Sequence, residues 1–325
     1  MRVLVSYSGG KDSQACLIQA VQKYGADKIT AIFCDTGWEH PDTYQHIEET
    51  TKQLGVELSV LKAELGFVDL AKKKTRFPST KRRFCTSELK VKPMIDYILS
   101  LNDSCIIIQG IRANESASRS EMDVECMYFK NYFEPIETNS TKLIKYEKQL
   151  KKAKGEKERL EIISKIEKTE ERLKAGKEDG IYYTYRKKEV IEYCMRFDAS
   201  VLRPIFNWTA QQVIDSILGG GQQPNPLYFR GFSRVGCFPC VMCRLSEIKG
   251  LLREKDMMDR LIKAEDYIGR SFFPPLYIPK WACANKKYPM IRDVFKYVTD
   301  KNLTKDMFEP EEGYSCMSLY HGLCE

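Results

Sequence analysis

The chain has 325 residues and a formal net charge of +7 at pH 7. Its composition, 43% hydrophobic and 30% charged, is that of an ordinary globular protein with room for one large or two modest domains. No apolar run approaches the roughly 18–20 residues that span a bilayer, and the polar, glycine-rich stretch after Tyr7 is unlike a signal peptide. We therefore expect a cytoplasmic protein with no membrane partner.

The first third of the chain alternates short apolar runs with segments of helical character. Strands are predicted over residues 3–6, 29–34, 56–61 and 105–109, and helices over residues 13–24, 41–54 and 87–101. Ser87 is expected to be the N-cap of the last helix. This alternation predicts an α/β fold, a doubly wound and mainly parallel sheet covered on both faces. Ligands would lie at the carboxyl ends of its strands, where polar, glycine-bearing loops follow Ser6, Cys34 and Gln109.

From about Thr141 to Lys177, leucine and isoleucine recur at helical spacing among lysines and glutamates, with Gly155 near a break. This pattern predicts a charged helical hairpin inserted into the α/β fold, which either braces the fold or docks a partner. Further along, Thr209 is expected to cap a helix running to Leu218. We expect three parts: an α/β core over residues 1–137, the hairpin insertion over residues 138–180, and a remainder over residues 181–325 that ends in helices.

A strongly basic segment, Lys72–Arg83, contains seven Lys or Arg residues and no acid. Charge runs often form only a solvated face. The alternative is a sleeve for an anionic ligand, which would be nucleotide phosphate, sulfate or a nucleic-acid backbone. Under the second interpretation, this segment contacts a nucleic-acid substrate.

A phosphate-binding loop is predicted between the first strand and the first helix, with the sequence Ser8-Gly9-Gly10-Lys11-Asp12-Ser13. The two glycines allow a tight turn that exposes N–H groups, and the helix N-terminus adds partial positive charge. Lys11 offers a point charge, Ser8 and Ser13 offer hydroxyls, and Asp12 is suited to Mg²⁺ that bridges phosphates. The spacing differs from that of a Walker A loop. We therefore expect ATP with Mg²⁺ as the ligand.

This loop resembles the PP-loop of the N-type ATP pyrophosphatases, adenine-nucleotide hydrolases that split ATP between the α and β phosphates. Further segments resemble the phosphoadenosine phosphosulfate (PAPS) reductase branch of that superfamily. They are Cys34–Gly37, Phe84–Pro93, Gly110–Ser116 with Arg119, Arg203–Ile205 with Trp208, and Asn225–Tyr228. The resemblance implies a HUP-like PP-loop fold and a nucleotide site that also includes Asp35, Gly110, Arg112 and Arg119. The two arginines are suited to bidentate contact with phosphate or sulfate.

The intact loop bears on the reaction, because PAPS reductases usually carry an eroded form. Lys11 and Asp12 make most sense where a leaving pyrophosphate must be stabilised. We therefore expect an enzyme that adenylates a substrate for sulfur transfer, like the sulfur-activating proteins of DNA phosphorothioation, with Lys11, Asp12 and Arg112 as catalytic residues. A sulfur donor protein, a cysteine desulfurase or a thioredoxin-like protein, would be a partner. The alternatives are a thiol-dependent PAPS or APS reductase that releases sulfite and a non-catalytic nucleic-acid-binding module.

A cysteine motif, Cys237-x2-Cys240-x2-Cys243, places three thiols within seven residues. Soft thiolates select zinc or an iron–sulfur cluster, and a fourth ligand is needed. The iron–sulfur members of the PAPS reductase family join cysteines near the Cys85 element to a Gly-Cys-x-x-Cys element like this one. That resemblance implies Cys85 as the fourth ligand and a [4Fe–4S] cluster, with zinc as the alternative.

Two cysteines near the C-terminus, Cys316 and Cys324, have no assigned role. PAPS reductases use a cysteine in a C-terminal tail as the nucleophile on sulfur, but their Glu-Cys-Gly motif is absent here. Either residue could be that nucleophile, a metal ligand or a bystander.

Overall fold

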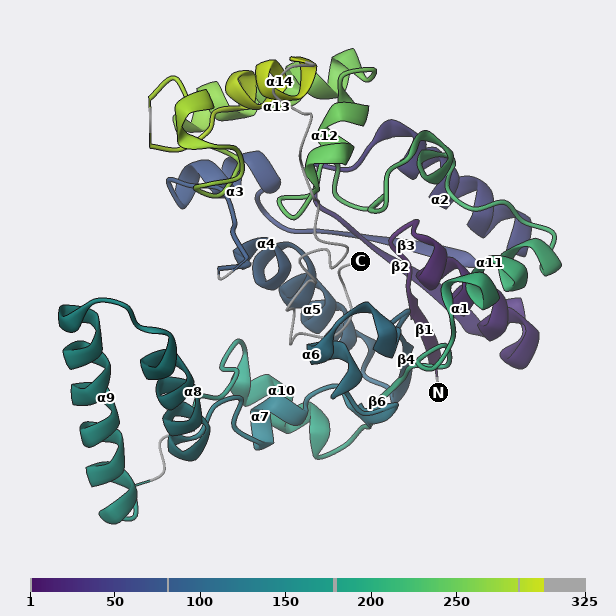
Figure 1. Ribbon diagram of the computed structural model, residues 1–325. Coiled ribbons are helices and arrows are strands. Elements are labelled where there is room, and N and C mark those ends of the chain that lie inside the picture. Colours follow the sequence, from purple (N-terminus) through teal and green to yellow (C-terminus); the bar gives the residue numbers. More distant parts are fainter. Residues whose placement is uncertain (1, 81, 178–179, 286, 301–325) are drawn as a thin grey trace. The chain divides into compact units, whose positions relative to one another are not determined.

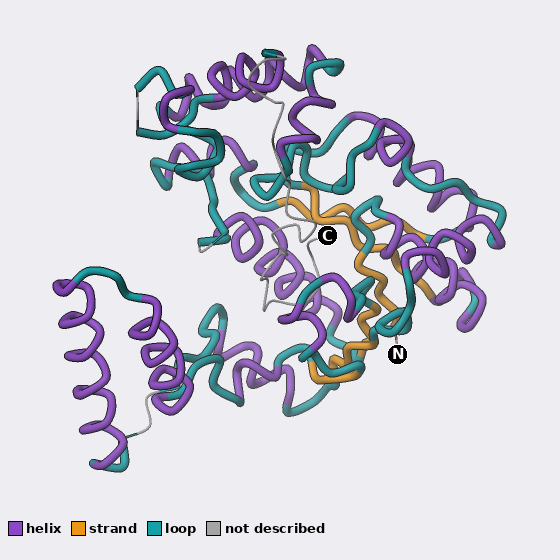
Figure 2. The backbone as a smooth tube through the Cα atoms, in the orientation of Figure 1, coloured by secondary structure: helices purple, strands orange, loops and turns teal. Residues whose placement is uncertain are grey.

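The computed structural model describes residues 2–80, 82–177, 180–285 and 287–300. They form two compact units, one built from the segments before residue 127 and after residue 197, the other from residues 127–197. The larger unit contains the sheet and the smaller one consists mainly of helices (Figures 1 and 2). No helix in the described ranges is long and apolar enough to cross a membrane. Cys316 and Cys324 lie outside the described residues.

The sheet of the larger unit has six strands in the order β3-β2-β1-β4-β6-β5. The strands are β1 (Arg2–Ser6), β2 (Ile29–Asp35), β3 (Glu57–Lys62), β4 (Cys105–Ile108), β5 (Glu125–Met127) and β6 (Ala199–Leu202). β1 pairs with β2 and β4, β2 with β3, and β4 with β6, all in parallel. Because the strand order reverses on either side of β1, the predicted doubly wound, mainly parallel sheet is confirmed. In such sheets ligands bind at the carboxyl ends of the strands at this switch point, here β1 and β4.

Helices cover both faces of the sheet, with α1, α2 and α11 on one side and α5 on the other (Figure 1). The helices of this unit are α1 (Lys11–Tyr24), α2 (Pro41–Leu54), α3 (Phe67–Lys73), α4 (Phe84–Thr86), α5 (Lys92–Leu101), α6 (Ala117–Ser120), α11 (Ala210–Gly219), α12 (Leu245–Leu251), α13 (Lys255–Ile268) and α14 (Ile291–Thr299). Short 3₁₀ helices are η1 (Ala26–Lys28), η3 (Ala113–Glu115), η4 (Pro226–Arg230) and η5 (Lys280–Ala282). The core on the α1 side buries Val5, Leu17 and Ile217 completely. The predicted helical C-terminal region is confirmed by α12, α13 and α14.

Local sequence signals set most helix boundaries in this unit. α2 spans the residues predicted, because Pro41 suits the first turn and Gly55 ends the helix in the left-handed conformation, with φ of 66°. Thr209 caps α11 as predicted, since its side chain accepts a hydrogen bond from the N–H of Gln212 at 3.2 Å. α1 begins two residues earlier than predicted, with Gly10 as its N-cap, so the phosphate loop runs directly into the helix.

The expectation that Ser87 begins a helix as its N-cap is wrong. The chain is already helical from Phe84, and Ser87 opens a π-helical segment, η2 (Ser87–Val91), that joins α4 to α5. A π-helical turn holds more residues than an α-helical turn and is frequent at functional sites. Lys90 lies within this segment and is buried.

The smaller unit contains the predicted charged hairpin. Its helices are α7 (Lys130–Phe133), α8 (Asn139–Lys152), α9 (Glu156–Lys174) and α10 (Lys187–Cys194). α8 and α9 lie side by side, and Gly155 in the loop between them is the N-cap of α9 (Figure 2). Thr138 begins α8 as a cap that accepts a hydrogen bond from the N–H of Thr141. The hairpin exposes Leu160 and most of its charges.

A buried carboxylate, Glu265 of α13, ties together the C-terminal helices of the larger unit. It accepts hydrogen bonds from the N–H groups of Phe272 and Ile291, both at 2.7 Å, and so joins α13 to the chain before α14. The side chain is fully buried. Burial raises the pKa of Glu265 to about 7, because desolvation outweighs these two hydrogen bonds.

We expect Glu265 to make the stability of the fold depend on pH. Its folded-state pKa is raised from 4.5, so its contribution is present below pH 4.5 and is lost as pH rises through about 7. The free energy of unfolding of the wild type relative to Glu265→Gln should therefore fall by about 3 kcal/mol across this window. Urea unfolding of both proteins at several pH values measures this difference.

The comparison must be made between the two proteins, because buried His46 titrates with the opposite sign. Burial lowers the pKa of His46 to about 4, so its neutral form contributes stability that is lost as pH falls. This contribution is the same in the wild type and in Glu265→Gln, and cancels in the difference. A difference that stays constant from pH 4.5 to 8 would contradict the assignment to Glu265.

Candidate functional site

The loop after β1 folds into a compact turn against the first turn of α1. Gly9 has a φ of 81°, a conformation that favours glycine. The Ser13 hydroxyl donates to the carbonyl of Gly10 at 2.9 Å and accepts from the N–H of Ser8 at 3.3 Å, which closes the turn. Lys11, Asp12 and Ser13 form the start of the helix, so the turn places the helix N-terminus at the carboxyl end of β1.

Asp12 is the centre of a chain of alternating charges. Its side chain is fully buried, and its two carboxylate oxygens contact Lys11 Nζ at 2.6 Å and Arg112 Nε at 2.5 Å. The Arg112 guanidinium lies 3.9 Å from the Glu115 carboxylate, which also accepts from the backbone N–H of Arg112 at 3.1 Å and pairs with Arg119. Three cations and two carboxylates thus alternate from Lys11 to Arg119. The Lys11 side chain is 20% exposed, so this row of charges ends at the phosphate loop in an accessible cation.

Gly110, which follows β4, allows the loop after that strand to contact the start of α1. A Cβ atom at position 110 would lie 2.6 Å from the backbone nitrogen of Ser13 and 2.7 Å from the carbonyl carbon of Asp12. Both neighbours are backbone atoms, which cannot rotate away. The absence of a side chain at Gly110 is therefore what lets Arg112, two residues later, reach Asp12.

Substitution Gly110→Ala is expected to push the loop after β4 away from α1. We expect a loss of about 1–3 kcal/mol in the free energy of unfolding, the usual cost of overpacking a tight contact, and weaker nucleotide binding. Gly219→Ala is the matched control, because a Cβ there meets nothing within 4 Å. Urea unfolding of both variants measures the cost, and equal effects would contradict the tight contact.

The segment Asn225–Tyr228 braces the loop from the other side. Asn225, fully buried, donates from its amide to the carbonyl of Gly9 at 3.2 Å. The Tyr228 hydroxyl accepts from the N–H of Lys11 at 3.0 Å, and the Tyr228 ring lies under the Lys11 ammonium, 5.5 Å from ring centroid to Nζ. The sequence singled out this segment only through its family resemblance, and its contacts hold the loop in position.

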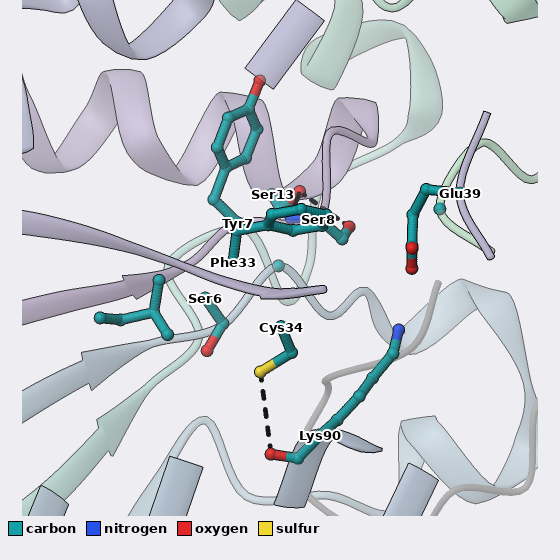
Figure 3. Close-up of a pocket in the computed structure, with 11 residues that line it drawn as sticks. Ser6, Tyr7, Ser8, Ser13, Phe33, Cys34, Glu39 and Lys90 are labelled. Atoms are coloured by element: carbon teal, nitrogen blue, oxygen red, sulfur yellow. Dashed lines mark hydrogen bonds between the residues drawn. The ribbon is translucent and has the colours of Figure 1, made fainter. Parts of the chain in front are cut away.

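A pocket opens at the carboxyl ends of the central strands, beside this loop (Figure 3). Its walls come from the ends of β1 and β2, the phosphate loop, Gly110, Lys90 and the neighbourhood of the cysteine motif. Among the predicted site residues, Ser8, Ser13 and Gly110 line it. It lies at the switch point of the sheet, where the sequence predicted the ligand.

Eight of the eleven residues that line the pocket were absent from the predicted site, among them Lys90, Glu39 and Ser6. Lys90 and Glu39, both buried, turn the ends of their side chains toward the same space in Figure 3. The hydroxyl of Ser6 is buried there and has no hydrogen-bond partner among the described residues. The Phe84–Pro93 segment, which was singled out by its family resemblance, contains Lys90 and was the available signal for it. An unpaired hydroxyl facing the pocket is a ready partner for a polar ligand.

Seven of the predicted nucleotide-site residues are not part of the pocket lining: Gly9, Gly10, Lys11, Asp12, Asp35, Arg112 and Arg119. Asp35, at the end of β2, accepts hydrogen bonds from Tyr44 at 2.6 Å and from the N–H of Gly37 at 2.8 Å, and pairs with Lys62 at 3.1 Å. Burial opposes ionisation, but these partners together lower the pKa of Asp35. Asp35 thus holds the loop after β2, and Arg119 supports the charge chain through Glu115.

The cysteine motif is anchored on the loop that follows β2. Trp38 donates from its ring N–H to the carbonyl of Pro239 at 3.0 Å and accepts from the N–H of Phe238 at 2.7 Å through its own carbonyl. The Cys237 thiol lies 3.7 Å from the Glu39 carboxylate. Because Glu39 and Gly236 line the pocket, the motif begins at the edge of the nucleotide-facing wall.

The four predicted metal ligands share one region but do not converge. Cys85 and Cys243 are buried in the same hydrophobic cluster, and Cys237 packs against it. Within residues 2–80, 82–177, 180–285 and 287–300, no three His, Cys, Asp or Glu side chains are arranged to hold a metal ion. Burial raises the pKa of Cys243 well above its usual value, with the nearby Glu247 charge adding to the effect. The donor chemistry therefore suits a soft metal, whereas the side-chain positions do not form a ligand set.

Several known proteins are similar to this chain over most of its length. Residues 2–243 match the Phosphoadenosine phosphosulfate reductase domain. An uncharacterized 37.8 kDa protein of Escherichia phage 186 is 27% identical and aligns with 99% of this chain and 96% of its own length. An uncharacterized protein of Methanocaldococcus jannaschii is 24% identical over 78% of this chain, which spans 38% of that protein. A phosphate complex of phosphoadenylyl-sulfate reductase from Candida auris has 14% identity and a TM-score of 0.42, over 74% of this chain and 83% of its own.

Proposed function

The chain belongs to the family of the phosphoadenosine phosphosulfate reductase domain, and on that premise we propose that it binds ATP and cleaves it to AMP and pyrophosphate. In this reaction an oxygen of the substrate is adenylated, which activates the substrate for sulfur transfer. The family and its fold are enzymatic and belong to the PP-loop superfamily. The adenylation is the proposal.

The observation that carries the proposal is the pairing of Asp12 with both Lys11 and Arg112. An enzyme that only holds a preformed sulfonucleotide has no leaving pyrophosphate to stabilise. A site that expels pyrophosphate needs cations placed in advance where negative charge accumulates, in a setting with little water. Asp12 places two such cations at the N-terminus of α1, and the third, Arg119, is linked to them through Glu115.

The residues of the chain support the following steps. The helix N-terminus, Lys11 and the Ser8 and Ser13 hydroxyls bind the phosphates of MgATP. The substrate oxygen attacks the α-phosphorus, and the bond to the oxygen that bridges the α and β phosphates breaks. The electron pair of that bond leaves with pyrophosphate, whose charge Lys11 and Arg112 offset. Tyr228 and Asn225 keep the loop fixed while this charge moves.

Lys90 and Ser6 have complementary parts in this proposal. Lys90 enters the pocket from η2, opposite the phosphate loop, and places a further cation beside the bound nucleotide. The buried Ser6 hydroxyl offers the nucleotide a hydrogen-bond partner. Arg112 and Lys90 thus belong to different segments that both end at the switch point of the sheet.

We also propose that Cys85, Cys237, Cys240 and Cys243 bind a [4Fe–4S] cluster, with zinc as the alternative. Support comes from the spacing of Cys237, Cys240 and Cys243 in the sequence. Support also comes from the hydrophobic core in which Cys85 and Cys243 are both buried. Such a cluster would supply electron transfer or hold sulfur near the pocket, and a cysteine desulfurase or thioredoxin-like protein would deliver the sulfur. None of the steps above depends on it. Measurement of iron and acid-labile sulfide in anaerobically purified protein tests this assignment. Protein that contains zinc and no iron would favour a zinc site instead.

Binding measurements separate ATP from a sulfonucleotide as the ligand. Calorimetric titration of the full chain with MgATP, PAPS and APS is expected to give the tightest binding with MgATP. Lys11→Met should weaken MgATP binding by about tenfold or more, the usual effect of removing a charged hydrogen-bond donor. Tighter binding of PAPS, together with no detectable binding of MgATP, would contradict the proposal.

A sulfonucleotide reductase is the second candidate, favoured by the family to which the chain belongs. It predicts release of sulfite from PAPS or APS in the presence of a thiol and without ATP. Sulfite measured under reducing, anaerobic conditions would establish it. No sulfite from either sulfonucleotide would leave ATP cleavage as the better account.

A further inference from the structure

The basic segment Lys72–Arg83 is not used by the proposed function, and it forms one wall of a second pocket. The opposite wall is formed by the chain between α13 and α14. The lining includes Arg76, Arg270, Pro274, Pro275, Tyr288 and Val241. Its cavity volume is about 260 Å³, just below the range of about 300–1,000 Å³ of typical small-molecule sites.

The floor of this second pocket is rigid. Phe77 is buried and packs edge-on against Phe272, with ring centroids 5.1 Å apart, and Phe272 packs in the same way against Phe273 at 5.3 Å. The Ser271 hydroxyl donates to the Phe273 carbonyl at 2.9 Å, and Glu265 holds the N–H of Phe272. These contacts join the basic segment to the C-terminal helices, so the two walls keep a fixed separation.

The electrostatics of this pocket are of one sign. Its described lining contains two arginines and no Asp or Glu. Arg76 and Arg270 are exposed, and neither pairs with an acid among the described residues. Lys73, Lys74 and Arg82 are exposed on the same acid-free segment. A merely solvated charge run usually carries mixed signs, whereas this wall combines unpaired cations with aromatic and proline surface.

We propose that this second pocket and the basic segment bind a single-stranded nucleic acid. The exposed cations contact the phosphates, and one unpaired base enters between the exposed prolines and the half-buried side chain of Tyr288. Proteins that bind single strands combine a basic groove with aromatic surfaces on which bases stack. A double helix has no free base to place there, and a run of acidic side chains carries no base to fill the pocket.

The location of the pocket suggests what the bound strand is for. Val241, in its lining, lies within the cysteine motif, one residue from Cys240. The motif in turn begins at the wall of the nucleotide pocket, through Gly236 and Glu39. A strand bound here would lie beside the sulfur chemistry of the motif. The claim that the nucleic acid is the substrate of adenylation rests on the proposed function. The claim that it binds here does not.

Binding is tested without ATP, by fluorescence anisotropy of labelled DNA and RNA oligonucleotides of about 15 nucleotides, a length that covers a typical single-strand site. The full chain should bind, and affinity should fall steeply as salt rises from about 50 to 200 mM. Double charge reversal, Arg76→Glu with Arg270→Glu, is expected to weaken binding at least about tenfold. Lys148→Glu with Lys152→Glu, exposed residues of α8, is the control with the same charge change and should bind as the wild type does.

Two competitors separate the occupants. Inorganic polyphosphate of matched length carries the charge without bases, and poly-glutamate represents an acidic protein partner. The oligonucleotide is expected to compete at least about tenfold better than either, because base stacking adds about 1–3 kcal/mol per base. Equal competition by polyphosphate or by poly-glutamate overturns the proposal, and so does equal binding by both double variants. MgATP binding by the Arg76→Glu, Arg270→Glu protein should be unchanged, so failure here is distinct from failure of the proposed function.

Discussion

Replacement of Asp12 by asparagine is expected to have the largest effect of any single change in the site. The substitution removes the charge that pairs with both Lys11 and Arg112, and it replaces the charged acceptor of the 9%-exposed Arg112 side chain by a neutral amide. Breaking a buried ion pair from one side costs about 3–5 kcal/mol. We therefore expect the free energy of unfolding to fall by about that amount and formation of AMP from ATP to fall at least about a hundredfold. Urea unfolding and a chromatographic assay of AMP measure the two effects.

A matched control is available on α2. Asp42 also pairs with an arginine, Arg230, but this pair lies at the surface, where the Arg230 side chain is 42% exposed. Asp42→Asn should cost less than about 1 kcal/mol and leave AMP formation unchanged. Lys11→Met provides the complementary case, because this side chain is partly exposed and its loss should lower activity while stability is kept. Equal losses of stability in Asp12→Asn and Asp42→Asn would show that the buried charge chain does not stabilise the fold.

Lys90→Met is expected to have the second largest effect. Methionine keeps the volume and removes the charge that η2 brings to the nucleotide pocket. A hydrogen bond to a charged group contributes about 1.5–3 kcal/mol, so MgATP should bind about 10–100-fold more weakly. Because a buried lysine is costly to desolvate, the variant should be at least as stable as the wild type. Calorimetric titration and urea unfolding measure the two quantities.

Lys92→Met is the matched control for Lys90, two residues away on the same helical segment. Lys92 is partly exposed and forms an i, i+4 pair with Glu88 at 2.5 Å, outside the pocket. Its loss should change MgATP affinity by less than about twofold, as expected for a surface pair. Equal losses of MgATP affinity in Lys90→Met and Lys92→Met would show that Lys90 does not contact the nucleotide.

Much of the fold follows from local sequence. Pro41 and Gly55 mark both ends of α2, and the alternation of apolar runs with helical segments predicts the mainly parallel sheet. The phosphate loop could be placed because its glycines and charges lie between a strand and a helix. Charged helical periodicity likewise predicts the hairpin of α8 and α9. Each of these features depends on neighbours within a few residues of one another.

The rest of the site depends on contacts between distant segments. Arg112 meets Asp12 across 100 residues, and Tyr228 meets the Lys11 N–H across 217. No periodicity links such pairs, so composition and spacing named the residues without saying which would meet. The π-helical turn at Lys90 is a further case, because helix propensity alone favours an uninterrupted α-helix from residue 87. The wrong N-cap at Ser87 and the missed lysine share this cause.

The cysteines show the same division. The spacing of Cys237, Cys240 and Cys243 indicates a soft-metal ligand set, but the fold alone does not bring these side chains to one point. Metal binding can reorganise a short loop around itself, since ligand binding and folding are coupled. Measurement of the iron and sulfide content of the protein therefore tests the predicted metal site, independently of the nucleotide site.

The most direct test of the central claim is to identify the products formed from ATP labelled at the α-phosphate. The full chain is incubated with MgATP, a reductant and single-stranded oligonucleotide, and the products are separated by chromatography. Cleavage between the α and β phosphates predicts label in AMP or in an adenylated product, with matching pyrophosphate and none of either in Asp12→Asn. Label in ADP with release of inorganic phosphate, or unchanged ATP beside sulfite released from PAPS, would contradict the account.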